Sequence, residues 1–333
     1  MSSLRQRFKI VAAIPIACFL VSCQHTSNKN DTPAASDAST PLFDTMPAHT
    51  CGDHLVAGDP GTSDQLLCRE GFAVGYNYQY KVANWVAYHV TASSVSARYD
   101  RNDNFREDAE VTVGSRATLS DYSGSGYDRG HLAPAATVDF SYNAMDESFL
   151  LSNIAPQLPD FNRNGWADLE QYVRDCTVEK GELYVITGPI FTSASVPTIG
   201  NGVAVPDAYY KVILNPTPPV SAFALKIPHQ ALAAEEIGNY ITSIDQVEAA
   251  TGFDFLASVT DEIENSIERD TTPVCTLPWG QSQGTGGTTY SCDIAKNCSD
   301  MSSCDEAYYY LNTCGKSSLD ADKDGVPCES LCN

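Results

Sequence analysis

The chain has 333 residues, of which 43% are hydrophobic and 10% aromatic, so it is long enough for one large domain and one small one. Its 20 Lys and Arg stand against 42 Asp and Glu, which gives a formal net charge of −22. The overall field of so acidic a chain does not steer it to a polyanion. The charge therefore argues against a nucleic-acid ligand, unless basic groups and metal ions gather locally.

Residues 1–23 have the pattern of a targeting segment. Three basic residues within the first nine precede an apolar run over 10–20 that is too short to span a bilayer comfortably. Leu20-Val21-Ser22-Cys23 resembles a bacterial lipobox. The resemblance implies cleavage before Cys23, lipidation of Cys23 and anchoring at the outer membrane or cell surface. The alternative is a plain secretory signal and a secreted protein.

Cysteine usage agrees with an exported protein. Setting aside Cys18 in the signal and the lipidated Cys23 leaves ten cysteines, an even number that predicts disulfides. Six of the ten fall in the last 42 residues. Zinc binding is the competing interpretation, but the spacings contain no Cys-x-x-Cys pair and no nearby histidine. Disulfides are therefore the better prediction.

Composition divides the rest of the chain into four parts. Residues 24–48 are rich in small and polar types with little to bury, which is typical of a flexible tether. Residues 49–279 carry the mixed apolar patterns of a folded domain. A Gly-rich linker over 280–289 then leads to a small disulfide-rich module over 290–333.

The large domain reads as an α+β fold. Runs of β-branched and aromatic residues predict strands at 85–90, 183–187, 209–214 and 222–226. Helical spacing predicts helices over 164–176 and 244–251, the second ended by Gly252. Strands outnumber helices and do not alternate regularly with them, which argues against a doubly wound sheet.

The sequence Tyr-Asp-Arg-Gly-His-Leu-Ala-Pro over 127–134 places a histidine beside a cation and a carboxylate. His131 follows Asp128, Arg129 and Gly130, the last of which lets the backbone turn. A neutral imidazole can take a proton from water near pH 7, next to a phosphate held by the arginine. A lone histidine is more often structural, so the prediction depends on a second segment.

That segment begins at Asn162 and offers a metal ligand. Phosphodiester hydrolysis needs an activated water, neutralised charge on phosphorus and a stabilised leaving oxygen. Asn162 lies at the start of the predicted helix, and Glu170 follows two turns later on the same face. The amide carbonyl suits Mg²⁺, and the carboxylate can orient its waters. The alternative is that Asp128 is a turn residue, Asn162 an N-cap and Glu170 a solvated helix residue.

These segments, together with Leu-Ser-Asn-Ile-Ala-Pro-Gln over 151–157, resemble the DNA/RNA non-specific endonucleases, the endonuclease G-like ββα-metal family. The resemblance runs in consistent order from about residue 68 to residue 257. It implies a ββα-metal fold with a central antiparallel-rich sheet and flanking helices. It also implies hydrolysis of DNA and RNA with Mg²⁺ or Mn²⁺.

Carried over residue by residue, the resemblance gives five side chains a role. They are the general base His131, the single direct metal ligand Asn162, the acidic residue Glu170 that holds metal-bound water, the supporting asparagine Asn153 and the phosphate-facing Arg129. The family also uses an arginine that stabilises the transition state. Here Arg101 is the choice, with Arg98 and Arg106 as close alternatives. Asp128 is expected to orient local structure rather than to bind metal.

The C-terminal module contains a calcium-loop pattern. From Asp320 onward, carboxylates stand at positions 1, 3 and 5 and glycine at position 6, an arrangement that wraps oxygens around a hard cation. Residues 290–332 resemble the excalibur extracellular calcium-binding module. The resemblance implies four Ca²⁺ ligands, Asp320, Asp322, Asp324 and Glu329. The alternative is an exposed acidic turn.

The leading hypothesis is an extracytoplasmic endonuclease that cuts DNA and RNA. Two alternatives are a calcium-dependent surface-binding protein with an inactive nuclease fold, and a phosphodiesterase acting on a smaller nucleotide. The complete set of His131, Asn162 and Glu170 disfavours the first, and the net charge of −22 keeps the second open. The oligomeric state stays open, a homodimer included.

Overall fold

The computed structural model describes most of the chain from residue 51 to residue 279 and parts of the C-terminal region. The described residues are 42–43, 51–96, 99–193, 195–279, 296–301, 307, 310–311, 314, 316–320 and 327–332. The predicted signal and its Cys23 lie outside them, as do the linker, Arg98, Asp322 and Asp324. Within the described part of the chain, no helix has both the length and the apolar character needed to cross a membrane.

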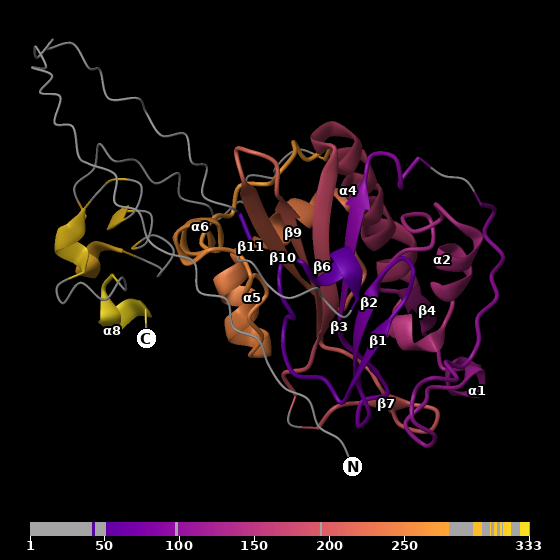
Figure 1. The fold of residues 1–333 in the computed structure, drawn as a ribbon. Coiled ribbons are helices and arrows are strands. Elements are labelled where there is room, and N and C mark those ends of the chain that lie inside the picture. Colours follow the sequence, from indigo (N-terminus) through magenta and orange to yellow (C-terminus); the bar gives the residue numbers. More distant parts are fainter. Residues whose placement is uncertain are drawn as a thin grey trace, which may run out of the picture. The chain divides into compact units, whose positions relative to one another are not determined.

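A seven-stranded sheet organises the large domain (Figure 1). Its strands, in spatial order, are β1 (Gln65–Cys68), β2 (Ala73–Asn77), β3 (Val82–Thr91), β6 (Glu182–Ile190), β9 (Ala208–Asn215), β10 (Ser221–Pro228) and β11 (Ile241–Thr242). Every neighbouring pair is antiparallel. The fold is thus α+β with a central antiparallel sheet, as the sequence predicts.

Two small ribbons and several short helices complete the domain. The ribbons are β4 (Asp128–His131) with β5 (Ile154–Gln157), and β7 (Thr198–Ile199) with β8 (Val203–Ala204). The longer α-helices are α4 (Ala167–Lys180), α5 (Ile244–Thr251) and α6 (Asp261–Ile267). The short ones are η1 (Gly52–Leu55), α1 (Leu119–Tyr122), α2 (Tyr142–Glu147), η2 (Leu151–Asn153), α3 (Pro159–Phe161), the π-helical turn η3 (Asn162–Trp166) and η4 (Ala234–Tyr240).

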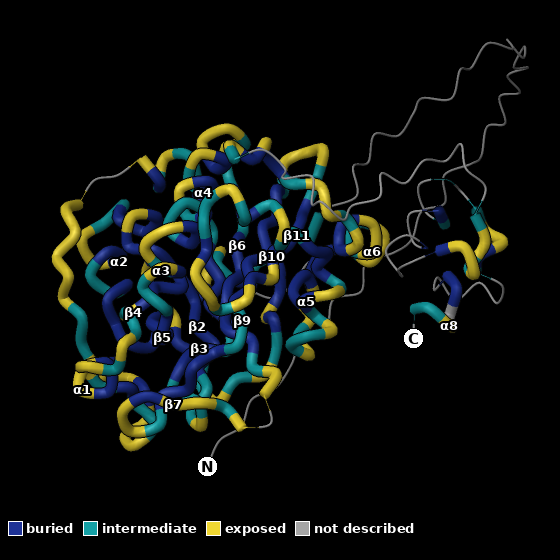
Figure 2. The backbone as a smooth tube through the Cα atoms, turned by 180° about the vertical axis from the view of Figure 1, so that it is seen from behind, coloured by how far each residue is buried: buried dark blue, intermediate teal, exposed yellow. Residues whose placement is uncertain are grey.

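Apolar cores lie on both faces of the sheet. Side chains alternate along β3, so Val86 and Tyr88 enter one core while Trp85 and Ala87 enter the other. The first core is closed by α4 and the β4–β5 ribbon, and the second by η1, α5 and α6. Because both faces are covered, the central strands are buried along most of their length (Figure 2).

The predicted strands fall within β3, β6, β9 and β10, and the helix predicted over 244–251 is α5. Ser243 caps its start by accepting the Gln246 N–H at 3.2 Å, and Gly252 ends it with φ +74°. The other predicted helix is wrong at its start. A π-helical turn with a kink at Asn164 (φ −113°, ψ −112°) occupies 162–166, and α4 begins only at Ala167.

Disulfides join distant segments in both regions, as the cysteine count predicts. Cys51 pairs with Cys68, Cys176 at the end of α4 pairs with Cys275, and Cys298 pairs with Cys328. Cys314 and Cys332 are also disulfide-bonded. Leu42 and Phe43, within the stretch predicted as tether, belong to the domain, since Phe43 forms a β-bridge with Val259 and an edge-on ring contact with Tyr184.

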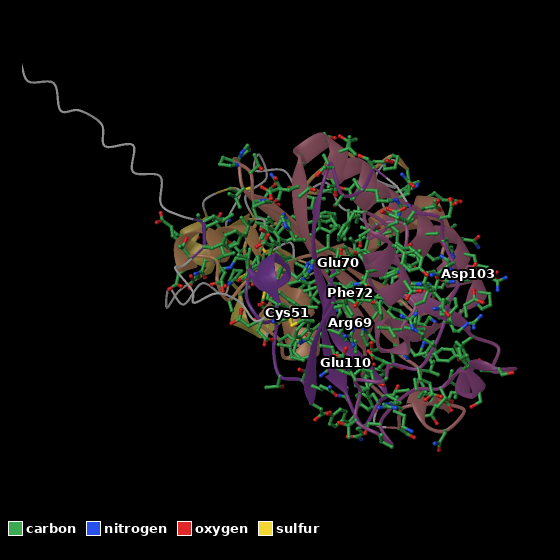
Figure 3. The ribbon with its side chains drawn as sticks, turned by 45° about the vertical axis from the view of Figure 1, so that its right-hand side comes forward. Cys51, Arg69, Glu70, Phe72, Asp103 and Glu110 are labelled. Atoms are coloured by element: carbon green, nitrogen blue, oxygen red, sulfur yellow. A yellow bond between two sulfur atoms is a disulfide. The ribbon has the colours of Figure 1, made fainter. Side chains whose placement is uncertain are left out.

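A buried ion pair fixes the segment that leads to the site. The Arg69 guanidinium donates to Glu110 Oε1 at 2.7 Å, and both residues are labelled in Figure 3. It also donates to Asp108 Oδ2 at 2.6 Å, and Asp108 accepts the Ser152 hydroxyl at 2.5 Å. Arg69 and Asp108 are almost fully buried. A buried carboxylate needs such partners, since its desolvation is otherwise uncompensated. The network ties Arg69, the residue after β1, to Ser152, the neighbour of Asn153.

The C-terminal region has its own small core. Met301, Ala307, Tyr310, Leu319 and Cys328 form it. Its described helices are η5 (Cys298–Asp300), η7 (Ser317–Leu319) and α8 (Glu329–Cys332). The Cys328 N–H donates to Leu319 O at 2.9 Å, which closes the two ends of the predicted calcium loop.

Candidate active site

His131 is the last residue of β4, and its environment keeps the imidazole neutral. The residue is 8% exposed, and its Nε2 has no hydrogen-bond partner among the described residues. Its ring lies between Phe105 and Phe149, with ring centroids 5.4 and 5.1 Å away. Burial and the positive charge of Arg101 lower the pKa of His131 to about 3. The neutral form, which can accept a proton, therefore dominates at neutral pH.

Gly130 has a role other than the predicted one. It lies in the regular strand β4, and its φ is not in the positive region, so it makes no turn. A Cβ at this position would meet the Gln157 Oε1 at 2.1 Å and the Gln157 Cδ at 2.2 Å. Glycine is needed because the Gln157 side chain of β5 packs directly on the backbone of β4.

Asn153 holds the backbone that follows His131. Its Oδ1 accepts the Ala133 N–H at 2.9 Å, and its Nδ2 donates to Ala133 O and to Ser148 O, both at 2.9 Å. The main-chain oxygen of Asn153 also accepts the Leu132 N–H at 3.0 Å. The side chain is fully buried, so these bonds satisfy its amide and place it behind the site as a support.

Asn162 lies in the π-helical turn rather than at a helix N-cap. Its φ and ψ are −63° and −45°, which excludes the N-cap alternative. The Nδ2 donates to Asp128 Oδ2 at 3.0 Å, and this bond fixes the amide with its carbonyl oxygen available as a ligand. A π-helical turn is a common way to place a functional side chain within a helix.

Asp128 orients Asn162 and is itself held by Arg163. Arg163 Nε and Nη2 donate to the two carboxylate oxygens of Asp128 at 2.7 and 2.6 Å. Burial alone would raise the pKa of Asp128, but the hydrogen bonds from Arg163 and Asn162 lower it below its usual value. A carboxylate with both oxygens engaged in this way positions its neighbours, as the sequence predicts.

Glu170 lies in the first turn of α4, where three cations surround its half-buried carboxylate. Burial raises the pKa of Glu170 to about 7, against the opposing charges of Lys211, Arg174 and Arg101. The nearby Trp166 indole N–H also lowers the pKa of Glu170, although its geometry falls short of a hydrogen bond. The charge of Arg101 lowers the pKa of both Glu170 and His131, so one guanidinium lies near both the proposed base and the proposed metal side of the site.

Two cations near Glu170 were not predicted from the sequence. Lys211 on β9 is completely buried, with its Nζ 3.4 Å from the Tyr88 hydroxyl and 4.6 Å from the Trp166 ring centroid. Arg174 lies one turn after Glu170 on α4 and donates to Thr137 and Gln171. Each had a sequence signal: Arg174 stands at i+4 from Glu170, and Lys211 interrupts a continuous apolar run.

Replacing Lys211 with methionine should move the acid limb of the activity profile to higher pH. Lys211 lowers the pKa of Glu170, so its loss raises that pKa further and the carboxylate ionises only at higher pH. We expect a shift of at least about one pH unit in kcat/KM, since one unit equals about 1.4 kcal/mol of lost interaction. The exposed Lys226 on β10 is the control, and K226M should leave the profile in place. An unchanged profile for K211M would contradict the role of Lys211.

The structure also separates the candidate arginines. Arg101 is half exposed, stacks over the Phe149 ring at 4.9 Å and forms an ion pair with the exposed Asp103 at 2.6 Å. Arg106 is committed to Asp146 and donates to both its carboxylate and its main-chain oxygen. Arg129 is exposed and lies over the Phe105 ring at 4.2 Å. Arg129, and Arg101 with its exposed partner Asp103, are therefore the guanidinium groups best placed to meet a phosphate on the His131 side.

The donor set fits a hard divalent cation. An oriented amide oxygen at Asn162 is a ligand that Mg²⁺ takes directly, and a carboxylate at Glu170 can hold the waters that complete the shell of the ion. Burial raises the pKa of Glu170 despite its three cationic neighbours, and a divalent cation nearby would further favour the ionised carboxylate. In the module, Asp320 lies between η7 and residues outside the described part, and Glu329 begins α8.

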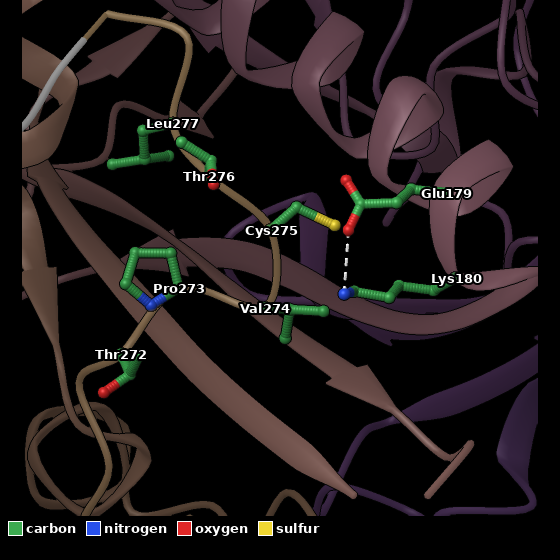
Figure 4. A pocket seen from close by; sticks show the side chains of 8 residues that line it. All are labelled: Glu179, Lys180, Thr272, Pro273, Val274, Cys275, Thr276 and Leu277. Atoms are coloured by element: carbon green, nitrogen blue, oxygen red, sulfur yellow. Dashed lines mark ion pairs between the residues drawn. The ribbon is translucent and has the colours of Figure 1, made fainter. Parts of the chain in front are cut away.

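A surface pocket elsewhere contains none of these residues. It is lined by Glu179 and Lys180 at the end of α4 and by the segment 272–277 (Figure 4). Glu179 and Lys180 form an ion pair at 2.8 Å. The pocket therefore carries no argument about catalysis.

Comparison with known proteins agrees with this geometry. Residues 52–262 match the DNA/RNA non-specific endonuclease family, and residues 295–329 match the Excalibur calcium-binding domain. A nuclease of Nostoc is 36% identical over 65% of this chain and 84% of its own length. Human mitochondrial endonuclease G is 35% identical over 62% of this chain and 74% of its own. Nuclease C1 of Cunninghamella echinulata is 39% identical over 60% and 86%.

A solved structure shows the same fold. It is the crystal structure of the EndoG/EndoGI complex, which concerns the mechanism of EndoG inhibition. It superposes on this chain with a TM-score of 0.59 at 31% sequence identity, and the match covers 62% of this chain and 91% of the solved one. The family model spans well over half of the chain and includes every catalytic residue proposed above. The chain therefore belongs to the DNA/RNA non-specific endonucleases, metal-dependent phosphodiester hydrolases, and carries a C-terminal Excalibur calcium-binding domain.

Proposed function

We propose that this nuclease cleaves DNA and RNA internally with His131 as the general base. The observation that carries the proposal is the buried, neutral His131, whose Nε2 has no partner among the described residues and whose neighbour Arg101 also acts on Glu170. His131 takes a proton as a water oxygen bonds to phosphorus, and the bond from phosphorus to the leaving sugar oxygen breaks. Arg101 and Arg129 face the charge that develops on the phosphate.

Asn162 would bind Mg²⁺ or Mn²⁺ directly and Glu170 would hold the waters of the ion, which when bound neutralises the phosphate and the leaving oxygen. Asp128 keeps the Asn162 amide in position, and Lys211 and Arg174 favour the ionised form of Glu170. Asn153 supports the backbone after His131. Each residue then has one task at a stated atom.

Incubation of the purified mature chain with plasmid DNA and with RNA tests this function. In Mg²⁺ or Mn²⁺ we expect nicked and linear plasmid followed by fragments, shortened RNA, and no cleavage in EDTA. Cleavage of a small phosphodiester without cleavage of either polymer would favour the smaller-nucleotide alternative. No metal-dependent hydrolysis of any of these substrates would favour the inactive surface-binding protein.

We further propose an extracytoplasmic protein anchored through lipidated Cys23. The lipobox-like Leu20-Val21-Ser22-Cys23 supports this, as do the disulfides, which persist in oxidising compartments. Labelling cells with a radioactive fatty acid should mark the wild type and not C23S. Label that remains on C23S would contradict the anchor. In the module, we propose Asp320, Asp322, Asp324 and Glu329 as the Ca²⁺ ligands.

A further inference from the structure

A group of carboxylates lies on the face of the sheet opposite to His131 and Glu170. It consists of Asp245 and Glu248 on α5, Asp254 after it, Glu264 on α6 and Glu268 at the end of α6, here called the α5–α6 cluster. Oxygens of Asp245, Glu248 and Glu268 all lie within 4.8 Å of one another, and so do oxygens of Asp254, Glu264 and Glu268. Glu268 is common to both groups.

Glu268 is the exceptional member, because it is buried without compensation. The residue is 9% exposed, and its Oε1 is inaccessible and has no hydrogen-bond partner among the described residues. Its backbone is pinned, since its main-chain oxygen accepts the N–H groups of Ile244 and Asp245 at 2.8 and 3.3 Å. Its carboxylate lies in the cluster, since an oxygen of Glu268 is within 4.8 Å of oxygens of the other members. A buried carboxylate oxygen with no donor is costly and calls for a ligand.

The neighbours add negative charge rather than relieve it. Burial, followed by the charges of Glu248 and Glu264, raises the pKa of Glu268 to about 8. Arg269 is a cation beside the cluster; its Nε is 3.6 Å from Asp245 Oδ2, and its side chain is half exposed. Glu248 is already positioned, because its Oε1 accepts the Phe255 N–H at 2.9 Å.

We propose that the α5–α6 cluster binds a Ca²⁺ ion separate from the active-site metal and from the Excalibur domain. Ca²⁺ bonds oxygens at about 2.3–2.6 Å and takes six to eight of them in flexible geometry, so ligand oxygens up to about 5 Å apart can share one ion. Mg²⁺ fits less well, since it demands a compact octahedron and keeps most of its waters. The ion displaces the proton of Glu268 and ties α5 to α6.

The test uses the full chain with the module loop silenced by D320N, D322N and D324N. Calorimetric titration with Ca²⁺ at pH 7.5 compares this parent with E268Q and with E262Q. Glu262 is an exposed residue of the same helix α6 outside the cluster, so E262Q is a matched control. We expect E268Q to bind one Ca²⁺ fewer than the parent or at least about tenfold more weakly, and E262Q to match the parent.

Two further measurements distinguish binding from a structural effect. Titration in buffers of different ionisation enthalpy should show proton release on Ca²⁺ binding in the parent and not in E268Q. Ca²⁺ should raise the melting temperature of the parent and E262Q more than that of E268Q. Mg²⁺-dependent cleavage should be the same in all three. Equal Ca²⁺ stoichiometry and affinity in E268Q and the parent would overturn the proposal.

A protonated Glu268 without any ion is the competing outcome, and pH separates the two. Its pKa in the fold is raised above the ordinary value of 4.5, so without Ca²⁺ its contribution to stability is full below pH 4.5 and is lost as pH rises through about 8. Ca²⁺ should remove this loss in the parent. Should E268Q fail to fold, E248Q keeps an acceptor for Phe255 N–H and must weaken Ca²⁺ binding; unchanged binding in E248Q would also refute the site.

Discussion

Replacement of His131 by alanine should lower kcat for plasmid cleavage by about 10²–10⁴-fold, the usual worth of a positioned general base. The fold should persist, because the imidazole makes ring contacts but its Nε2 makes no hydrogen bond among the described residues. KM should change little, because the arginines and the metal ligands that meet the phosphate remain. Circular dichroism and thermal melting check the fold, and initial rates check the loss.

The pH profile and chemical rescue sharpen this prediction. The pKa of His131 is lowered to about 3, so the base is already neutral throughout pH 5–8 and should set no acid limb there. Added imidazole should restore part of the activity of H131G, since it can enter the space left by the ring. H89Q is the control: His89 lies on β3 and pairs with Glu182 at 2.8 Å, away from the proposed machinery. Retained activity in H131A would refute the general-base role.

Replacement of Asn162 by alanine is the second large effect we expect. It removes the oriented amide oxygen and should raise the Mg²⁺ concentration for half-maximal activity by at least about 100-fold, more than the loss of an outer partner costs. Saturating Mg²⁺ or Mn²⁺ should restore part of the rate, because His131 and Glu170 remain. Titration of activity with metal measures the change.

A graded series of variants tests the geometry around Asn162. D128N keeps an acceptor for the Asn162 amide but weakens the pair of hydrogen bonds from Arg163. Its effect should therefore lie between wild type and N162A. N143A is the control, because Asn143 is an exposed amide that bonds Glu70 outside the site. If N162A kept the metal dependence of the wild type, Asn162 would not be the ligand.

The sequence patterns predicted the strands and α5 correctly but did not predict the π-helical turn at 162–166. The strands and α5 follow from apolar runs and caps that depend only on near neighbours. The kink at Asn164 does not follow from near neighbours, because packing against a distant residue imposes the π-helical turn. The Gly165 N–H donates to Leu232 O at 2.9 Å, and a Cβ on Gly165 would meet the Leu232 side chain at 2.4 Å. Gly165 and Leu232 are 67 positions apart in the chain, so their contact produces no pattern in the sequence around either residue.

Gly130 and Lys211 illustrate the same limit from opposite directions. Gly130 looks like a turn residue in the sequence, and only the partner strand shows that the Gln157 side chain fills the space of a Cβ. Lys211 is a single charge in an apolar run of the sequence, and only the structure shows that both faces of β9 are covered and that this charge lies beside Glu170. In both cases the cause lies in another element.

The net charge was a misleading guide to the substrate. A charge of −22 argued against nucleic acid, whereas the chain belongs to a nuclease family. The distribution explains the conflict. Arg101, Arg129, Arg163 and Arg174 gather near His131 and Asn162, while the α5–α6 cluster lies across the sheet. Local cations and the metal act on the phosphate at short range, where the screened overall field matters less.

The π-helical turn at 162–166 has a consequence for how this part of the chain can change in length. An α-helix advances about 100° per residue, so deleting one residue from the turn to make it regular would rotate Asn162 by that angle relative to Glu170. The amide would then leave Asp128, its partner at 3.0 Å. Insertions and deletions that a surface loop would tolerate should therefore be excluded from these five residues throughout the evolution of an active enzyme.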